Sequence, residues 1–366
     1  MKLLDFNIHL DLDKRYGRLH IHADGRPLVG EGTHRLANER LAQLAEAGKR
    51  LNANLGRELG CSIGENIFRT LFDGPVGELF QKASAISAEK GNKLRIVLKY
   101  DLGTSDEDQL VHQVPWELLY DPQRRVFLAV DDCFVLVRYL RGQGYEWQPP
   151  VQPVRALLTD ACPSDVQRLD LDAEVSAVCT AFNRIRPAGH LLKSIRSISF
   201  NRLRQEFNLA SDNALPFHVW HHCGHGHVCQ NGTFQLVVHE VDGRRDSSAV
   251  NADARSLGEV LVQHPELRLV ILNVCLGAWK SGLAPLLASL SVPAVVGFRS
   301  EINDASASDF AKSLWRRLPG HPIDVAVQTA RASMAQTLQG AGFARVSLFL
   351  RSLDRPILTK SPPIKH

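Results

Sequence analysis

The sequence lacks the features that would assign it to a membrane, to a secretory route or to a nucleic acid. Its amino terminus carries Asp5, Asp11 and Asp13 where a signal peptide needs an uninterrupted apolar stretch, and no later run reaches membrane-spanning length. The formal net charge is only +4, and the lysines and arginines are scattered rather than gathered in a basic stripe. We therefore expect a cytoplasmic protein with no membrane partner and no direct nucleic-acid partner.

Low-complexity tracts, internal repeats and a disulfide framework are also missing. The seven cysteines are an odd number spread along the chain without secretory context, which favours reduced thiols. We expect most of them to be core residues, namely Cys61, Cys133, Cys162, Cys179 and Cys223. One reactive thiolate elsewhere in the chain remains compatible with this composition.

The length of the chain favours two domains, because 366 residues exceed the size at which one core usually keeps growing. The stretch EWQPPVQP, with Pro149, Pro150 and Pro153, can continue neither a helix nor a central strand. We place the boundary there, which gives an amino-terminal region of residues 1–150 and a second domain of residues 151–366.

The two regions differ in their hydrophobic pattern. In the first, DFNIHLDLD, RLHIHA and LRIVLKYDL predict strands and residues 36–55 predict a helix, so this half is mixed α and β. In the second, short apolar runs alternate with helical patterns, which predicts an α/β fold with a parallel sheet. Its predicted strands are VRALLTDA, FHVWHHC, LRLVILNVC, PAVVGF and RVSLFLRS, and its predicted helices are LDAEVSAVCTAF, FNRLRQEF, LAPLLASL and residues 305–317 and 324–338.

Two predicted strands end in groups that could carry out catalysis. FHVWHHC runs into His225 and Gly226, and LRLVILNV runs into Cys275, 50 residues further on. Ligands collect past the carboxyl ends of parallel strands, so neighbouring strands would bring these side chains together. A thiol beside an imidazole is readily ionised and becomes a nucleophile, and the N–H groups of Gly226 and Cys275 could stabilise an oxyanion.

These motifs resemble the CHAT domain, a caspase-like peptidase module common in bacteria. FHVWHHCGHG resembles its strand ending in His-Gly, and LVILNVCLGA resembles its strand ending in the catalytic cysteine. VPWELLYDP, VPAVVGFRSEINDASASDFAKSLWRRL and PIDVAVQTAR resemble three further elements of the family in the same order. No tetratricopeptide-like repeats accompany the domain, and Asn273 stands where other residues are usual.

The resemblance implies a cysteine endopeptidase with a caspase-like fold, His225 as general base and acid, and Cys275 as nucleophile. It assigns the oxyanion donor to Gly226 and the specificity pocket to Asn273, Asp160 and residues 299–304, including Arg299, Glu301 and Asp304. If Asp160 or Glu301 points inward, a basic residue before the cut is expected. Residues 1–150 would then form a regulatory or pseudo-protease-like half.

The resemblance also suggests a biological setting. Caspase-like enzymes usually need an event that orders their specificity loops, so an activating partner, a regulatory ligand or a cleavage is expected. At the family level we expect a role in bacterial antiviral defence or programmed cell death. The substrate would be a dedicated protein, for instance a gasdermin-like pore former or another effector.

Two alternatives to a cofactor-free protease stay open at this stage. The chain could keep the fold as a non-catalytic interaction scaffold, although the intact His225 and Cys275 argue against this. It could also be a zinc hydrolase, because several potential ligands cluster around the second predicted strand. They are His218, His221, His222, Cys223, His225, His227 and Cys229. Ligands that alternate along a strand point to opposite faces, so we expect no metal, with His218 and His222 bonded within the protein.

Overall fold

The computed structural model describes residues 2–26, 28–51, 55–103, 105–141, 153–185, 190–279, 281–290, 292–337, 340–351 and 353. The chain folds into two compact units. Unit 1 comprises Met1–Gln143 together with Arg331–Arg345, and unit 2 comprises Gly144–Ala330 together with Val346–His366. The boundary predicted at residue 150, with Pro149 and Pro150, lies outside the described residues.

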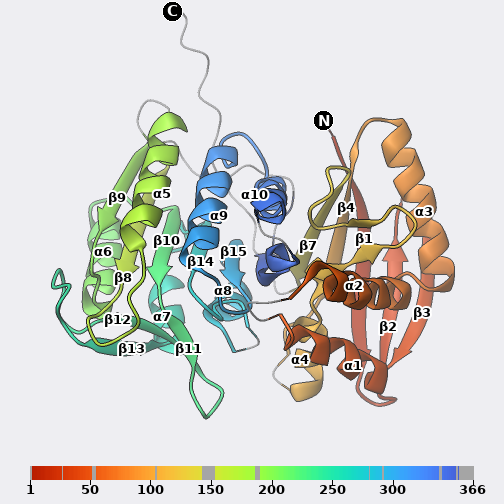
Figure 1. Ribbon diagram of the computed structural model, residues 1–366, viewed down its shortest axis with the longest axis horizontal. Coiled ribbons are helices and arrows are strands. Elements are labelled where there is room, and N and C mark those ends of the chain that lie inside the picture. Colours follow the sequence, from red (N-terminus) through yellow and green to blue (C-terminus); the bar gives the residue numbers. More distant parts are fainter. Residues whose placement is uncertain are drawn as a thin grey trace, which may run out of the picture. The chain divides into compact units, whose positions relative to one another are not determined.

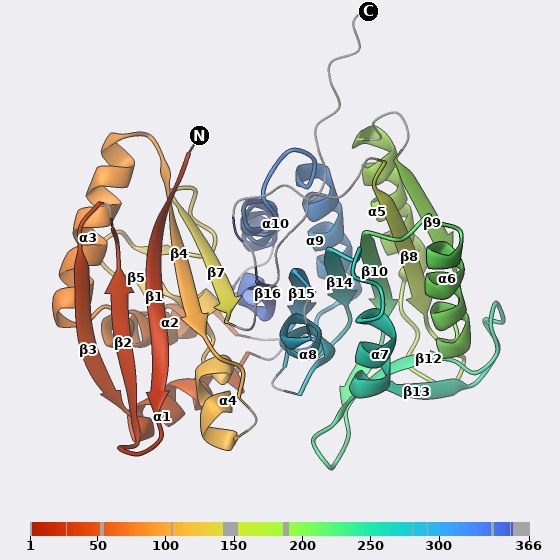
Figure 2. The same cartoon turned by 180° about the vertical axis from the view of Figure 1, so that it is seen from behind.

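Unit 1 contains a mixed sheet covered on one face by helices. The strands, in order across the sheet, are β3 (Glu31–Ala37), β2 (Arg18–Asp24), β1 (Leu3–Asp13), β4 (Lys93–Tyr100) and β7 (Phe134–Leu140). The helices are α1 (Asn38–Gly48), α2 (Arg57–Leu71), α3 (Gly74–Glu89) and α4 (Asp106–Gln113). Figure 2 shows β1, β2 and β3 in front, with α1, α2 and α3 behind them. The three strands predicted for this half are confirmed.

The helix predicted over residues 36–55 is shorter than its pattern suggested. Strand β3 runs through Ala37, which pairs with Arg18 of β2, so the backbone is extended up to the first residue of α1. The helix ends at Gly48, and the following turn bonds the N–H of Lys49 to the carbonyl of Glu46. Strand pairing therefore overrides the helical pattern at the start of this segment.

A buried charge cluster and a late chain segment complete unit 1. Arg138 of β7 forms two bonds to the carboxylate of Glu117, in the short 3₁₀ helix η1 (Trp116–Leu118), and both side chains are 1% exposed. Arg331 belongs to α10 (Ile323–Thr337), donates to the carbonyl of Leu136 and lies 3.6 Å from Glu117. Burial lowers the pKa of Arg331 to about 10. The cluster thus joins residues that are more than 190 positions apart in sequence.

Unit 2 contains the mostly parallel sheet that the sequence predicts. The strands, in order, are β16 (Val346–Leu350), β15 (Ala294–Phe298), β14 (Leu269–Asn273), β10 (Val219–Gly224), β8 (Arg155–Ala161) and β9 (Leu191–Ile195). Figure 1 shows α5 (Leu171–Ile185) and α9 (Asp304–Arg317) in front of this sheet. On the other face, seen in Figure 2, lie α6 (Phe200–Asp212), α7 (Ala254–Leu261) and α8 (Leu283–Ser289).

The last strand of unit 2 departs from the expected direction. β16 pairs with β15 antiparallel, although the sequence pattern suggested a parallel strand. Two helices, α9 and α10, separate these strands, so the chain comes back to the end where β15 finished and must run the other way. All other strand pairs in the described part of the main sheet of unit 2 are parallel.

A small second sheet follows the end of β10. It consists of β11 (Gly226–Val228), β12 (Phe234–His239) and β13 (Ala249–Asp253). The N–H of Val237 donates to the carbonyl of His225, which anchors this sheet to the end of β10. None of the helices in the described ranges is both long enough and apolar enough to span a membrane.

Candidate active site

The register of two parallel strands sets His225 and Cys275 at the same edge of the sheet. Cys223, near the end of β10, pairs with Asn273, the last residue of β14. His225 and Cys275 each lie two residues further along, so both stand just past the paired ends of these strands. Both are half-buried. Both residues therefore lie at the carboxyl-terminal edge of the sheet, where ligands and catalytic groups collect in parallel sheets.

The main chain is tightly packed and strained around this edge. The α-carbon of Gly226 abuts the main chain of Cys275, which leaves no room for a side chain at residue 226. Leu276 has a φ of 59°, in the left-handed region that a leucine rarely adopts. Its carbonyl accepts from the N–H of Trp279 at 3.0 Å, which closes a turn directly after the cysteine. Backbone strain of this kind clusters at functional sites.

A main-chain carbonyl orients the ring of His225. The Nε2 atom lies 2.6 Å from the carbonyl oxygen of Gln167, in the loop of residues 162–170 between β8 and α5. A carbonyl oxygen only accepts hydrogen bonds, so Nε2 carries a proton and donates it. In the neutral ring the lone pair is then on Nδ1. Nδ1 is therefore the atom that can act as a base.

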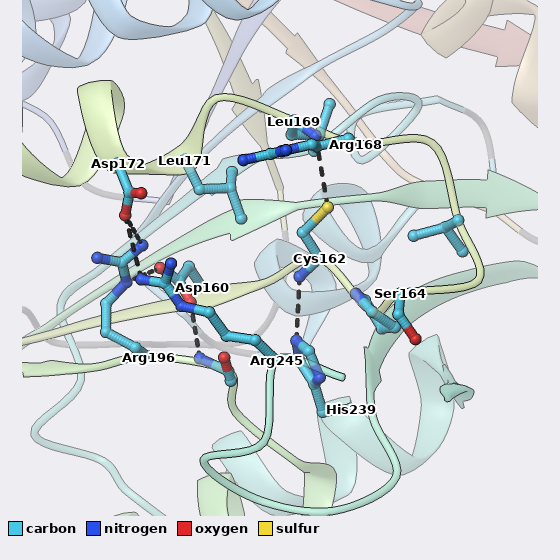
Figure 3. A pocket seen from close by; sticks show the side chains of 13 residues that line it. Asp160, Cys162, Ser164, Arg168, Leu169, Leu171, Asp172, Arg196, His239 and Arg245 are labelled. Carbon is cyan, nitrogen blue, oxygen red and sulfur yellow. Dashed lines mark hydrogen bonds and ion pairs between the residues drawn. The ribbon is translucent and has the colours of Figure 1, made fainter. Parts of the chain in front are cut away.

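A pocket of about 290 Å³ opens beside this loop, past the ends of β8 and β9 (Figure 3). Asp160 lines it but is only 3% exposed, and its carboxylate accepts from the N–H of Ser197 at 2.7 Å and is paired with Arg196. Arg196 also bonds Asp172 at 2.5 Å, and this bond lowers the pKa of Asp172. The charge of Asp160 is thus compensated within the protein.

Asn273 is buried and its amide is engaged. The Nδ2 atom donates to the carboxylate of Glu174, in the first turn of α5, and to the carbonyl of Ala307 at 3.1 Å. Glu174 and Asn273 are each 4% exposed. Burial and then the adjacent Glu174 raise the pKa of the Cys223 thiol well above its usual range, so this thiol stays protonated. Neither Asn273 nor Cys223 faces open solvent.

The segment of residues 299–304 follows β15 at the same end of the sheet. Arg299 is buried, with its guanidinium carbon 5.8 Å from the centre of the Trp279 ring, and Glu301 is exposed. Asp304, the first residue of α9, accepts from the N–H of Asp170 at 2.7 Å. This bond ties the start of α9 to the loop of residues 162–170.

Three buried groups lie close enough together to suggest a metal site, but they do not fit one. The candidate ligand atoms of Glu174, His221 and Cys223 lie within 4.8 Å of one another. Trp315, however, donates its indole N–H to Nδ1 of His221 at 2.8 Å. The proton of the neutral imidazole is then on Nε2, which faces Glu174 at 3.7 Å. A protonated nitrogen cannot ligate zinc.

The neighbouring histidines are bonded within the protein. Nδ1 of His218 accepts from the N–H of Arg155 at 3.0 Å, and Nδ1 of His222 lies 2.8 Å from the hydroxyl of Thr159. The prediction that His218 and His222 are satisfied strand residues is thus confirmed in part, because His218 lies one residue before β10 and Nε2 of His222 is buried without a partner among the described residues.

The cysteines are less uniformly buried than predicted. Cys223 is buried, whereas Cys61, Cys162 and Cys179 are half-buried and Cys133 is exposed. The prediction of a core position was wrong for Cys133, which lies in the turn before β7 with its N–H bonded to Asp131. Cys162 follows the last residue of β8 and lines the pocket described above.

Two contributors to this region were not predicted from the sequence. Gln167 contributes through its carbonyl oxygen, which every residue type has, so no sequence signal marks it. Glu174 did leave a signal, because it is an acidic residue on the face of α5 that also buries Leu171, Val175 and Val178. An acidic residue on the buried face of an amphipathic helix needs hydrogen-bond donors, and these are supplied from β10 and β14.

Comparisons with known proteins agree with this architecture. A family model described as "CHAT domain" matches residues 63–354. No curated protein matches the chain by sequence. Among solved structures, separase in the Saccharomyces cerevisiae separase–securin complex is similar over 98% of this chain and 30% of its own, with a TM-score of 0.52 and 11% identity. The chain thus spans about 30% of the length of separase.

Two further structures are similar over about half of the chain. The Drosophila initiator caspase Dronc is similar over 57% of this chain and 82% of its own, with a TM-score of 0.37 and 9% identity. A secreted C11 cysteine protease from Bacteroides thetaiotaomicron is similar over 50% of this chain and 56% of its own, with a TM-score of 0.29 and 12% identity.

Proposed function

The chain belongs to the CHAT domain family, with a caspase-like α/β fold, and we propose that it is a cysteine endopeptidase with Cys275 as nucleophile and His225 as general base and acid. The observation that supports this proposal is the register of β10 and β14, past whose ends His225 and Cys275 lie, together with the bond from Nε2 of His225 to the carbonyl of Gln167. The ring is thereby held in the tautomer that leaves Nδ1 to act as the base.

The proposed reaction needs only groups of this chain, a peptide and water. The Cys275 thiol gives its proton to Nδ1 of His225, and the thiolate attacks the scissile carbonyl. The imidazolium then returns this proton to the leaving amine, and an acyl-enzyme is left. Water activated by His225 hydrolyses the thioester and releases the thiol. The N–H groups of Gly226 and Cys275 are the proposed donors to the oxyanion in both halves of the reaction.

We further propose that the enzyme is latent until an activating partner, a regulatory ligand or a cleavage rearranges its specificity residues. Asp160 is paired with Arg196, and Asn273 is bonded to Glu174, so both of these proposed substrate-binding residues have internal partners. Arg299, Glu301 and Asp304 complete the proposed pocket. Substrate binding through Asp160 or Asn273 would require that these bonds open.

The biological proposal rests on the family. We propose a cytoplasmic enzyme of bacterial antiviral defence or programmed cell death that cuts one dedicated protein. A gasdermin-like pore former or another effector would be such a target. Residues 1–150 would act as a regulatory or pseudo-protease-like half. Co-expression with proteins encoded beside it, using the intact chain and Cys275→Ala, tests this: a fragment should form only with the intact chain.

Labelling with a peptidyl acyloxymethyl ketone tests the catalytic assignment. Mass spectrometry should find one label on Cys275, lost in Cys275→Ala and reduced at least tenfold in His225→Ala. The matched control is Cys179→Ala, which removes a half-buried thiol of α5 and should leave the labelling of Cys275 unchanged. Labelling of Cys275 that is slow and independent of His225 would favour the non-catalytic scaffold instead.

A further inference from the structure

The loop of residues 162–170 decides where the ring of His225 points. It leads from β8 into α5, and it contacts His225 through the Gln167 carbonyl, which lies 2.6 Å from Nε2 of the ring. Gln167 itself is exposed. A main-chain group on an exposed loop orients a histidine only if something else holds the loop in place.

The thiol of Cys162 makes two bonds that close this loop. Its Sγ donates to the carbonyl oxygen of Gln167 at 3.6 Å, and it accepts from the N–H of Leu169 at 3.4 Å. The Gln167 oxygen thus receives bonds from both His225 and Cys162. Figure 3 shows the contact between Cys162 and Leu169 across the pocket wall. A thiol is a weak donor and a weak acceptor, but here the donated bond and the accepted bond both hold the same loop.

The main chain of Cys162 is fixed independently of its thiol. Its N–H donates to Nε2 of His239 at 3.2 Å, and Nδ1 of His239 lies 3.0 Å from the hydroxyl of Ser247. The following Ser164 donates its hydroxyl to the carbonyl of Asp246 at 3.0 Å. Residue 162 is therefore anchored to the last residue of β12, and its thiol reaches from this fixed point to the far side of the loop.

We infer that Cys162 is a positioning residue for the proposed dyad: its thiol holds the Gln167 carbonyl where it orients His225, and so holds Nδ1 toward Cys275. This inference rests on the proposed function and adds a residue to it. Cys162 lies at the wall of a pocket rather than in the core, so packing alone does not account for its two loop contacts. It touches no reacting atom and acts only through Gln167.

The test compares wild type, Cys162→Ala, Cys162→Ser and the matched control Cys179→Ala. The rate at which iodoacetamide alkylates Cys275 is followed from pH 5 to 9 by mass spectrometry of the Cys275 peptide. Folding is checked by circular dichroism and thermal unfolding. Cys162→Ala should lower the rate at neutral pH about three- to tenfold and move the pH midpoint upward, as expected for the loss of weak hydrogen bonds.

Cys162→Ser keeps a donor and an acceptor at the same place, so it should recover most of the wild-type rate and midpoint. Cys179→Ala should match wild type. If Cys162→Ala lowers only the unfolding temperature and leaves the midpoint unchanged, Cys162 is structural and the inference is wrong. If wild-type Cys275 reacts no faster than Cys179 and does not depend on His225, the proposed function itself has failed.

Discussion

Gly226 and Cys275 meet main chain to main chain. A Cβ built on Gly226 would lie 2.7 Å from the carbonyl oxygen of Cys275 and 2.8 Å from the ring of Phe234. Real Cβ atoms do not approach a main-chain oxygen so closely, so the glycine is required for the two strand ends to come together.

Gly226→Ala should therefore separate the two strand ends. We expect the alkylation rate of Cys275 to fall at least tenfold and the free energy of unfolding to fall by about 1–3 kcal/mol, because overpacking costs energy of this size. Gly56→Ala is the matched control, since its added methyl group meets no atom within 4 Å. A Gly226→Ala protein that keeps both the wild-type rate and the wild-type stability would contradict this packing.

Unit 2 should lose stability as the pH falls from 6.5 toward 4. Burial lowers the pKa of His218 to about 4 and that of His222 to about 3. Burial also lowers the pKa of three further histidines of this unit, His190, His239 and His264. In the unfolded chain these histidines bind protons near pH 6.5, whereas in the folded unit they stay neutral until a lower pH. Protonation therefore favours the unfolded chain, and the stability present above pH 6.5 is lost as the pH falls.

Each such histidine should contribute a slope of about 1.4 kcal/mol per pH unit between pH 6.5 and its folded pKa. Urea unfolding followed by tryptophan fluorescence at a series of pH values measures this slope. His218→Asn keeps an acceptor for the N–H of Arg155 but removes one titrating group, so its slope should be shallower. An unfolding free energy that does not change between pH 7 and 4.5 would refute the prediction.

Removing the charge of Glu117 should destabilise unit 1 strongly. Glu117→Gln leaves the guanidinium of Arg138 buried at 1% exposure without its carboxylate, and Arg331 lies only 3.6 Å from the same group. Breaking a buried ion pair in this way costs about 3–5 kcal/mol. Glu65→Gln is the matched control, because its bond to Arg69 is an exposed contact one turn along α2, worth less than about 1 kcal/mol. If Glu117→Gln and Glu65→Gln lower the free energy of unfolding in urea by the same amount, the buried charge cluster does not stabilise unit 1 as proposed.

The purified protein should bind no zinc at Glu174, His221 and Cys223. The block is the indole N–H of Trp315, which occupies Nδ1 of His221 and leaves the proton on Nε2. Trp315→Phe removes this donor, so we expect it to gain up to one zinc per chain by metal analysis after dialysis. Trp220→Phe, which instead loses a bond to Thr159, should gain none. One tightly held zinc in wild type would show that the tautomer assignment is wrong.

Much of unit 2 follows from the sequence because its strands are short apolar runs whose ends carry recognisable groups. His225 and Cys275 stand out since each breaks an apolar run at its carboxyl end. The direction of β16 is missed although the sequence predicts both helices before it, residues 305–317 and 324–338, because an alternating pattern of strands and helices indicates parallel strands throughout. The contact between Gln167 and His225 could not be predicted either, because it is made by a main-chain oxygen, which every residue type has.

Unit 1 is built from two segments that are far apart in sequence, and this affects how it folds during synthesis on the ribosome. Residues 1–143 emerge early, but Arg331, Ala341 and Phe343, which bond or pack against Glu117, Leu55 and Phe127, emerge roughly two hundred residues later. The first-made unit is thus finished only after nearly all of the second has been translated. A nascent chain arrested before Arg331 would expose the apolar surface that Phe343 covers. We expect such a chain to bind a chaperone until the second segment of unit 1 has been synthesised.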